Sequence, residues 1–225
     1  MNQLPSNWII SETAHWIAIN KPSGWIVEHN PFESSIEAIT SAYLQIHTPK
    51  AILGIVHRLD KLTSGVLILA KKKQALKALN AQFAKRQVRK TYLAIVSNPP
   101  PQKAAILTHW LRKDTQNKRA LISANARKGS QEVRLHYRLL GNLDHRYLLE
   151  VHPMTGKFHQ IRAQLSLIKC PIVGDTLYGG EAEKEQGIGL HALKLRIVAP
   201  DSGEVKWLEA DLPEAERWEG WKVYL

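Results

Sequence analysis

Residues 57–65 read His57-Arg58-Leu59-Asp60-Lys61-Leu62-Thr63-Ser64-Gly65, and the apolar run Val66–Ala70 follows at once. The stretch places one carboxylate, Asp60, between cationic side chains and a Thr-Ser-Gly turn. One interpretation is that Asp60 caps a turn or a helix start, because its short side chain accepts backbone N–H bonds well. The other is chemical, because a carboxylate can attack as a nucleophile and form a covalent intermediate.

Hydrophobic periodicity predicts both helices and strands around this stretch. Apolar residues recur at helical spacing over 35–46 and 72–87, and the lysines of the second segment fall opposite its apolar stripe. Residues 133–139 alternate with the period of two that strands require. Further strands are expected at 15–19, 66–70, 91–96, 146–151 and 191–198, whereas 102–130 is basic, poorly periodic and is either irregular or a hairpin. The pattern therefore predicts an α+β fold.

Four further motifs follow in order along the chain: Asn20-Lys21-Pro22-Ser23-Gly24, Lys90-Thr91-Tyr92-Leu93-Ala94, Gly156–Arg162 (Gly-Lys-Phe-His-Gln-Ile-Arg) and Gly174–Gly179 (Gly-Asp-Thr-Leu-Tyr-Gly). Together with residues 57–65 they resemble the RluA branch of the RNA pseudouridine synthases, in which a His-Arg-Leu-Asp-x-x-Thr-Ser-Gly string carries the essential aspartate. The resemblance extends over nearly the whole chain.

That resemblance implies an architecture. It predicts the pseudouridine synthase fold, a bent and mostly antiparallel mixed sheet with flanking helices and a central catalytic cleft. Some relatives carry an N-terminal S4-type RNA-binding domain, but only about twenty residues precede the Lys21 motif here. We therefore expect residues 1–225 to form a single catalytic domain of the RluA type, which recognises RNA through its own body.

The resemblance also implies catalytic roles. Asp60 is expected to be the nucleophile that isomerises uridine, although the sequence leaves open whether it attacks the sugar or the base. Arg162 is expected to pair with Asp60 and keep it ionised, and Tyr92 to stack on uracil and help remove the C5 proton. Ordinary alternatives exist for both supporting residues: Arg162 in a surface ion pair and Tyr92 in strand packing.

Charge points to a polyanionic partner. The formal net charge is +11, and residues 61–90 contain nine Lys or Arg and no acid. Such a surface fits RNA, although a charge run is also a common solvated face. Arg58 is expected to fill the gap left by a flipped uridine, and His57 to shape the loop or touch a phosphate. The predicted RNA-binding residues are Arg58, His57, Lys71, Lys72, Lys73, Lys90, Lys157, His159 and Gln160.

Other features limit the possible functions. No apolar run approaches the roughly 20 residues that cross a bilayer, and no secretory leader is apparent, so we expect a cytoplasmic monomer that does not bind membranes. The single cysteine, Cys170, excludes an internal disulfide. His152 and His159 lack the spacing of a zinc-protease helix, and no cofactor signature is present, so we expect neither metal nor cofactor.

Two rival functions remain open. A non-catalytic RNA-binding protein explains the basic charge equally well but not the set Asp60, Tyr92 and Arg162. An RNA-directed hydrolase could use Asp60 to cleave the N-glycosidic bond without rejoining it. Between ribosomal and transfer RNA the sequence does not choose.

Overall fold

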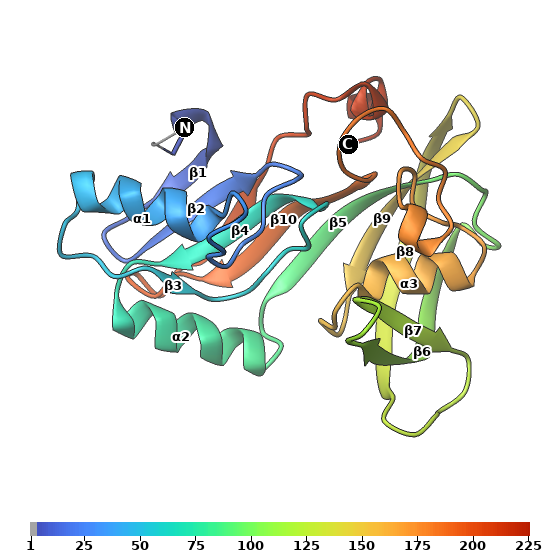
Figure 1. Ribbon diagram of the computed structural model, residues 1–225, viewed down its shortest axis with the longest axis horizontal. Coiled ribbons are helices and arrows are strands. Elements are labelled where there is room, and N and C mark those ends of the chain that lie inside the picture. The colour runs from blue at the N-terminus through green and yellow to red at the C-terminus, as the bar shows by residue number, and fades with distance from the viewer. Residues whose placement is uncertain (1–3) are drawn as a thin grey trace. The chain divides into compact units, whose positions relative to one another are not determined.

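The computed structural model describes residues 4–225, which divide into two compact units. The described part of unit 1 comprises residues 4–90 and Ala192–Pro213, and unit 2 comprises Thr91–His191 and Glu214–Leu225. The chain passes from one unit to the other inside β5 (Arg89–Val96), inside β10 (Leu190–Val198) and again between Pro213 and Glu214. Figure 1 labels the helices and strands of both units.

Unit 1 contains an antiparallel sheet built around a strand that is buried along its whole length. That strand, β4 (Ser64–Ala70), pairs with β2 (Trp16–Lys21) and the short β3 (Gly54–Ile55). β1 (Ile9–Glu12) pairs with β2, and β11 (Val205–Glu209) pairs with the unit 1 part of β10. The strands at 15–19, 66–70 and 191–198 are thus confirmed, while β1, β3 and β11 were not predicted.

Two helices of unit 1 agree with the hydrophobic periodicity. α1 (Ile36–His47) begins at Ser35, whose hydroxyl accepts the Ala38 N–H at 3.2 Å. α2 (Lys73–Ala84) buries Ala75 and Leu79 against β2 and β4 and leaves its lysines exposed. Helical spacing of apolar residues therefore located both helices to within a few residues.

Unit 2 is a second antiparallel arrangement with one α-helix. Its strand order is β5-β9-β8-β6-β7, with β6 (Ala104–Asp114), β7 (Arg119–Ser123), β8 (Gln131–Leu143) and β9 (Arg146–Pro153). β6 and β7 form a hairpin, so the basic segment 102–130 is the hairpin and not an irregular excursion. Helix α3 (Gln160–Leu167) follows β9. The structure thus confirms an α+β fold with mostly antiparallel strands.

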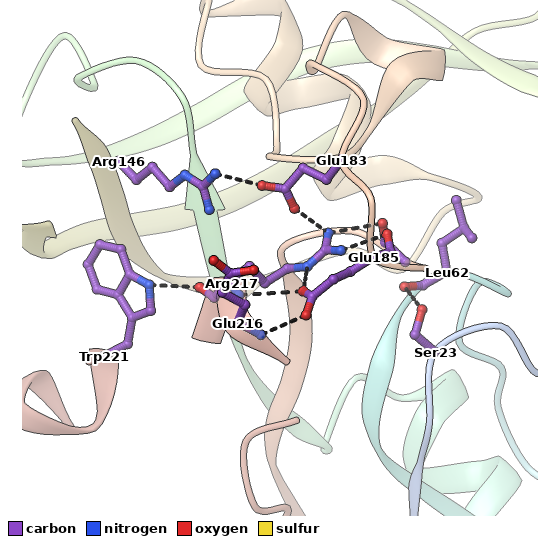
Figure 2. Close-up of polar contacts among 9 residues, drawn as sticks. Ser23, Leu62, Arg146, Glu183, Glu185, Glu216, Arg217 and Trp221 are labelled. Atoms are coloured by element: carbon purple, nitrogen blue, oxygen red, sulfur yellow. Dashed lines mark hydrogen bonds and ion pairs between the residues drawn. The ribbon is translucent and has the colours of Figure 1, made fainter. Parts of the chain in front are cut away.

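Four short 3₁₀ helices complete the described elements: η1 (Ser6–Trp8), η2 (Thr176–Tyr178), η3 (Glu216–Trp218) and η4 (Trp221–Tyr224). The last two belong to the C-terminal segment of unit 2, which Arg217 anchors. Its buried guanidinium binds Glu183 at 2.9 Å and the carbonyl of Glu185 at 2.8 Å (Figure 2). Within residues 4–225 no helix has the length and apolarity needed to cross a bilayer.

Candidate active site

Asp60 lies in unit 1 at the start of a tight turn directly before β4. The turn closes through the Thr63 N–H, which donates to the Asp60 carbonyl at 3.1 Å. The segment 21–24 then binds the turn from the side, because the Gly24 N–H donates to the Lys61 carbonyl at 2.8 Å. The Ser23 hydroxyl likewise donates to the Leu62 carbonyl at 2.7 Å (Figure 2). The backbone of the Asp60 turn is therefore fixed, while the Asp60 side chain remains half-buried.

The contacts of segment 21–24 with the Asp60 turn form a clamp, and Lys21 is its central residue. It is fully buried, and its ammonium donates to the carbonyls of Pro22 (2.9 Å), Trp25 (2.8 Å) and Lys61 (3.2 Å). Three acceptors match the three protons of an ammonium. Burial lowers the pKa of Lys21 to about 7, and the negative charge of Asp60 acts in the opposite direction. Lys21 therefore anchors the turn through its hydrogen bonds and, in its protonated form, places a positive charge beside Asp60.

The end of the motif is fixed by backbone geometry. Gly65 has φ +113°, and a Cβ added there would lie 2.2 Å from the carbonyl oxygen of Ala192 in β10. Only glycine fits such a close approach of two backbones. Its backbone pairs with Lys21 across β2 and β4, so the clamp and the Asp60 turn are linked through one strand pair.

The two cations that flank Asp60 are exposed and paired with acids of the segment 28–33. Arg58 binds both carboxylate oxygens of Glu28, at 2.9 and 3.0 Å, with 65% of its side chain exposed. Lys61 is paired with Glu33. Exposed pairs of this kind add little stability, so both cations can exchange their carboxylate for a phosphate.

The structure argues against two of the predicted RNA contacts in unit 1. His57 stacks on Phe83 with 4.8 Å between ring centroids, and its Nε2 accepts the Ile68 N–H at 3.2 Å. Burial lowers the pKa of His57 to about 3, which keeps the ring neutral and favours a loop-shaping role. Lys71 is only 4% exposed and is paired with Glu12, which argues against the predicted RNA contact.

The remaining predicted lysines lie at or near the surface of their units. Lys72 and Lys73 are exposed at the start of α2 in unit 1. Lys90 is half-buried in β5, and burial lowers its pKa. Lys157 is exposed in unit 2, before α3. These four keep their predicted role as RNA contacts.

Arg162 lies in unit 2, inside α3, and its side chain is held by an acid that was not predicted. Its Nε donates to Asp175 Oδ2 at 2.7 Å and its Nη2 to Oδ1 at 2.8 Å, with the two side chains 3% and 1% exposed. The Tyr178 ring lies 5.0 Å from the guanidinium carbon. This is a buried bidentate pair, so the surface ion pair considered for Arg162 is excluded.

Tyr178 and His159 are linked to each other beside the Arg162–Asp175 pair. Tyr178 accepts the Ala120 N–H of β7 at 2.6 Å and lies 3.0 Å from Nδ1 of His159, which itself stacks on Phe158. Burial is the main cause that lowers the pKa of His159 to about 3, and the charges of Arg162 and Lys113 add to it. The neutral ring can accept the Tyr178 proton, which favours a structural role over a phosphate contact.

Gln160 was predicted to bind RNA, and the structure corrects this. It is only 4% exposed, and its Oε1 accepts from Thr155 at 2.8 Å and from the Lys157 N–H at 3.2 Å. Its Nε2 donates to the Arg134 carbonyl at 3.1 Å and to Gln164 at 2.9 Å. These four bonds use the full capacity of the amide, so Gln160 organises the segment before α3.

Tyr92 is half-buried in β5, where it is paired with Val151 of β9 in unit 2. Unit 1 thus brings Asp60 together with Lys21, Arg58 and Lys61, and unit 2 brings Arg162 together with Asp175, Tyr178 and His159. Asp175 and Tyr178 belong to the Gly174–Gly179 motif, which the sequence singled out without giving it a role. Among residues 4–225 no group of three His, Cys, Asp or Glu side chains is placed to hold a metal ion.

The fold can now be compared with known structures. The solved structure of human RNA Pseudouridylate Synthase Domain Containing 4 matches with a TM-score of 0.76 and 25% identity, over 92% of this chain and 88% of that chain. The chain therefore has the pseudouridine synthase fold.

The family follows from the sequence profile of RNA pseudouridylate synthase, which matches residues 15–167. The chain belongs to this family and is of the RluA type. It is 32% identical over 234 aligned residues to tRNA pseudouridine synthase C of Pectobacterium carotovorum subsp. carotovorum, covering 94% of this chain and 60% of the relative. It is 31% identical over 222 residues to Ribosomal large subunit pseudouridine synthase D of Zymomonas mobilis, covering 92% of this chain and 69% of the relative. The chain thus spans about three fifths of the first relative's length and about two thirds of the second's.

Proposed function

We propose that this chain is an RNA pseudouridine synthase in which Asp60 is the nucleophile. The observation that carries the proposal is the Asp60 turn itself, whose backbone is clamped by Lys21, Ser23 and Gly24 while the carboxylate remains half-buried beside a buried ammonium. A turn held in this way needs no rearrangement of its backbone during the reaction.

The reaction requires no external reactant. Asp60 attacks either the sugar or the base, the C1′–N1 bond breaks, uracil turns, and C1′ is rejoined to C5. The C5 proton then leaves, N1 takes up a proton, and release of Asp60 restores the carboxylate, so the product has the mass of the substrate. Forming a covalent intermediate divides one difficult step into easier ones.

The supporting roles are assigned to two residues of unit 2. Arg162 is proposed as the cation that keeps Asp60 ionised, and Asp175 orients its guanidinium. Tyr92 is proposed to stack on the uracil and to help remove the C5 proton. Arg58 is proposed to occupy the space left by the flipped uridine, since its guanidinium is exposed and planar.

The proposed substrate is structured RNA, bound through the exposed cations Arg58, Lys72, Lys73 and Lys157 and the half-buried Lys90. Affinity for such a partner should fall steeply with salt, with a log–log slope of roughly −0.7 per phosphate neutralised on single-stranded segments. Titrations at several salt concentrations measure this slope. A flat response would exclude phosphate contacts as the source of affinity.

The relatives' names divide between transfer and ribosomal RNA, so the proposal extends to both classes. Mapping pseudouridines in total RNA from cells with and without the gene would identify the target. We expect at least one site to disappear on deletion and to return with the wild-type gene. Unchanged maps would contradict the proposal.

The rival functions predict other products. Incubating purified protein with labelled RNA should give pseudouridine in RNA of unchanged mass. Release of free uracil would instead identify a hydrolase, and binding without any product would identify a non-catalytic RNA-binding protein.

A further inference from the structure

The segment that pairs with the two cations beside Asp60 carries an unusually exposed aromatic side chain. Phe32 is 92% exposed, more than any other large apolar side chain in the described range, the next being Val223 at 82%. An aromatic ring in water forgoes the stabilisation that burial gives. An exposed ring at a functional loop is therefore a candidate contact for a partner.

The ring is presented by a well-defined turn. The Asn30 side-chain oxygen accepts the Phe32 N–H at 2.9 Å, and the Asn30 carbonyl accepts the Glu33 N–H at 3.3 Å. Pro31 occupies the second position of this turn, where its fixed φ is favoured, and Phe32 occupies the third. The turn therefore fixes the backbone of Phe32 while its side chain stays almost fully exposed.

The same segment is attached to the Asp60 turn at two points. Glu33, which follows Phe32, is paired with Lys61, and Glu28 is paired with Arg58. These cations stand on either side of Asp60 in the sequence, and all of these residues belong to unit 1. The exposed ring of Phe32 therefore belongs to a segment that contacts Arg58 and Lys61, the two cations on either side of the proposed nucleophile in the sequence.

We propose that Phe32 is a stacking site for an unpaired RNA base next to the target uridine. The inference rests on the proposed function and extends it to a second nucleotide. An exposed ring on a segment whose acids are paired with two exposed cations fits a nucleic acid, since every base offers a π-face and every nucleotide a phosphate. It does not fit a protein partner, because stable protein interfaces bury about 1,200 Å² or more and one ring supplies a small part of that.

The test compares Phe32→Ala, Phe32→Tyr and wild type on one RNA substrate. Loss of a stacked base should weaken binding by about 5- to 150-fold, while a tyrosine ring should retain most of the affinity. Trp207→Ala is the matched control, because Trp207 is an aromatic residue of unit 1 that is 55% exposed on β11. This control should bind RNA as wild type does.

The partner base is identified with substrates that carry an abasic nucleotide at each position flanking the uridine. At one position, the abasic substrate should lower the RNA affinity of wild type by as much as the Phe32→Ala substitution lowers it on the intact substrate. At that position, the abasic substrate should not lower the affinity of Phe32→Ala any further. Equal binding by Phe32→Ala and wild type, or additive losses at every position, would overturn the inference. If wild type binds these RNAs with the predicted Phe32 dependence but forms no pseudouridine, the proposed function fails and the stacking site stands.

Discussion

The carboxylate of unit 1 and the cation of unit 2 are positioned in opposite ways. Around Asp60 the structure fixes the backbone, through donors from Lys21, Ser23 and Gly24 onto the carbonyls of the turn. Around Arg162 it fixes the side chain, through a buried bidentate bond to Asp175. The backbone clamp fixes the turn from which the Asp60 side chain extends, whereas the bidentate bond fixes the orientation of the Arg162 charge itself.

The largest effect is expected where a buried charge loses its partner. Asp175→Asn leaves the Arg162 guanidinium buried without its counter-charge, so the free energy of unfolding should fall by about 3–5 kcal/mol. Urea unfolding measures this. The double variant Arg162→Met/Asp175→Asn removes both charges and should recover much of the stability while remaining inactive.

A control for this prediction is the exposed pair between Lys194 and Glu209, at 3.1 Å. Glu209→Gln should change the unfolding free energy by less than about 1 kcal/mol. Equal losses in Asp175→Asn and Glu209→Gln would show that the side-chain clamp of unit 2 has no special importance.

The clamp of unit 1 should respond to pH. Lys21 has a pKa of about 7 in the folded chain, whereas an unfolded lysine titrates near 10.4, so the unfolded state holds more protons between these values. The contribution of Lys21 to the unfolding free energy should therefore be constant below pH 7 and should rise above it, by at most about 1.4 kcal/mol per pH unit.

Lys21→Met isolates this contribution, because every other titrating group remains. The variant should be less stable than wild type by about 1–3 kcal/mol near neutral pH, since three carbonyls lose their donor. The gap should widen between pH 7 and 10 in urea titrations. A gap that does not change with pH would mean that Lys21 titrates in the folded chain as it does in water.

The smallest effect concerns the exposed cations. Glu28→Gln releases Arg58 and removes a negative charge near the proposed RNA path, so RNA affinity should rise several-fold with less than about 1 kcal/mol change in unfolding free energy. Glu204→Gln is the matched control, because its pair with Lys206 in unit 1 is also exposed. Identical affinities in the two variants would contradict an RNA contact by Arg58.

The sequence predicted the elements whose signal is local. α2 and β4 follow from helical spacing and from a continuous apolar run, because either pattern requires burial in any context. β1, β3 and β11 were missed because each has at most five residues and a weak or mixed pattern. Their pairing partners, not their own residues, make them strands.

The sequence indicated candidate residues where a motif is typical of one chemical role. It did not indicate contacts between residues that lie far apart in the sequence. The run Lys71–Lys73 shows only charge, and it is the paired Glu12 that decides which lysine is buried. The motif Gly156–Arg162 does not distinguish Gln160, which is bonded inside unit 2, from the exposed Lys157. Asp175 was overlooked because its partner lies thirteen residues away on another element.

The most direct test of the account is tritium release from RNA that carries uridine labelled at C5. Asp60→Asn keeps the size and much of the hydrogen bonding of the side chain but removes the nucleophilic charge. We predict that wild type and the control Asp144→Asn, an exposed carboxylate in the turn between β8 and β9, release tritium, and that Asp60→Asn folds, binds the RNA and releases none. Measurable release by purified Asp60→Asn would contradict the assignment of Asp60 as the nucleophile.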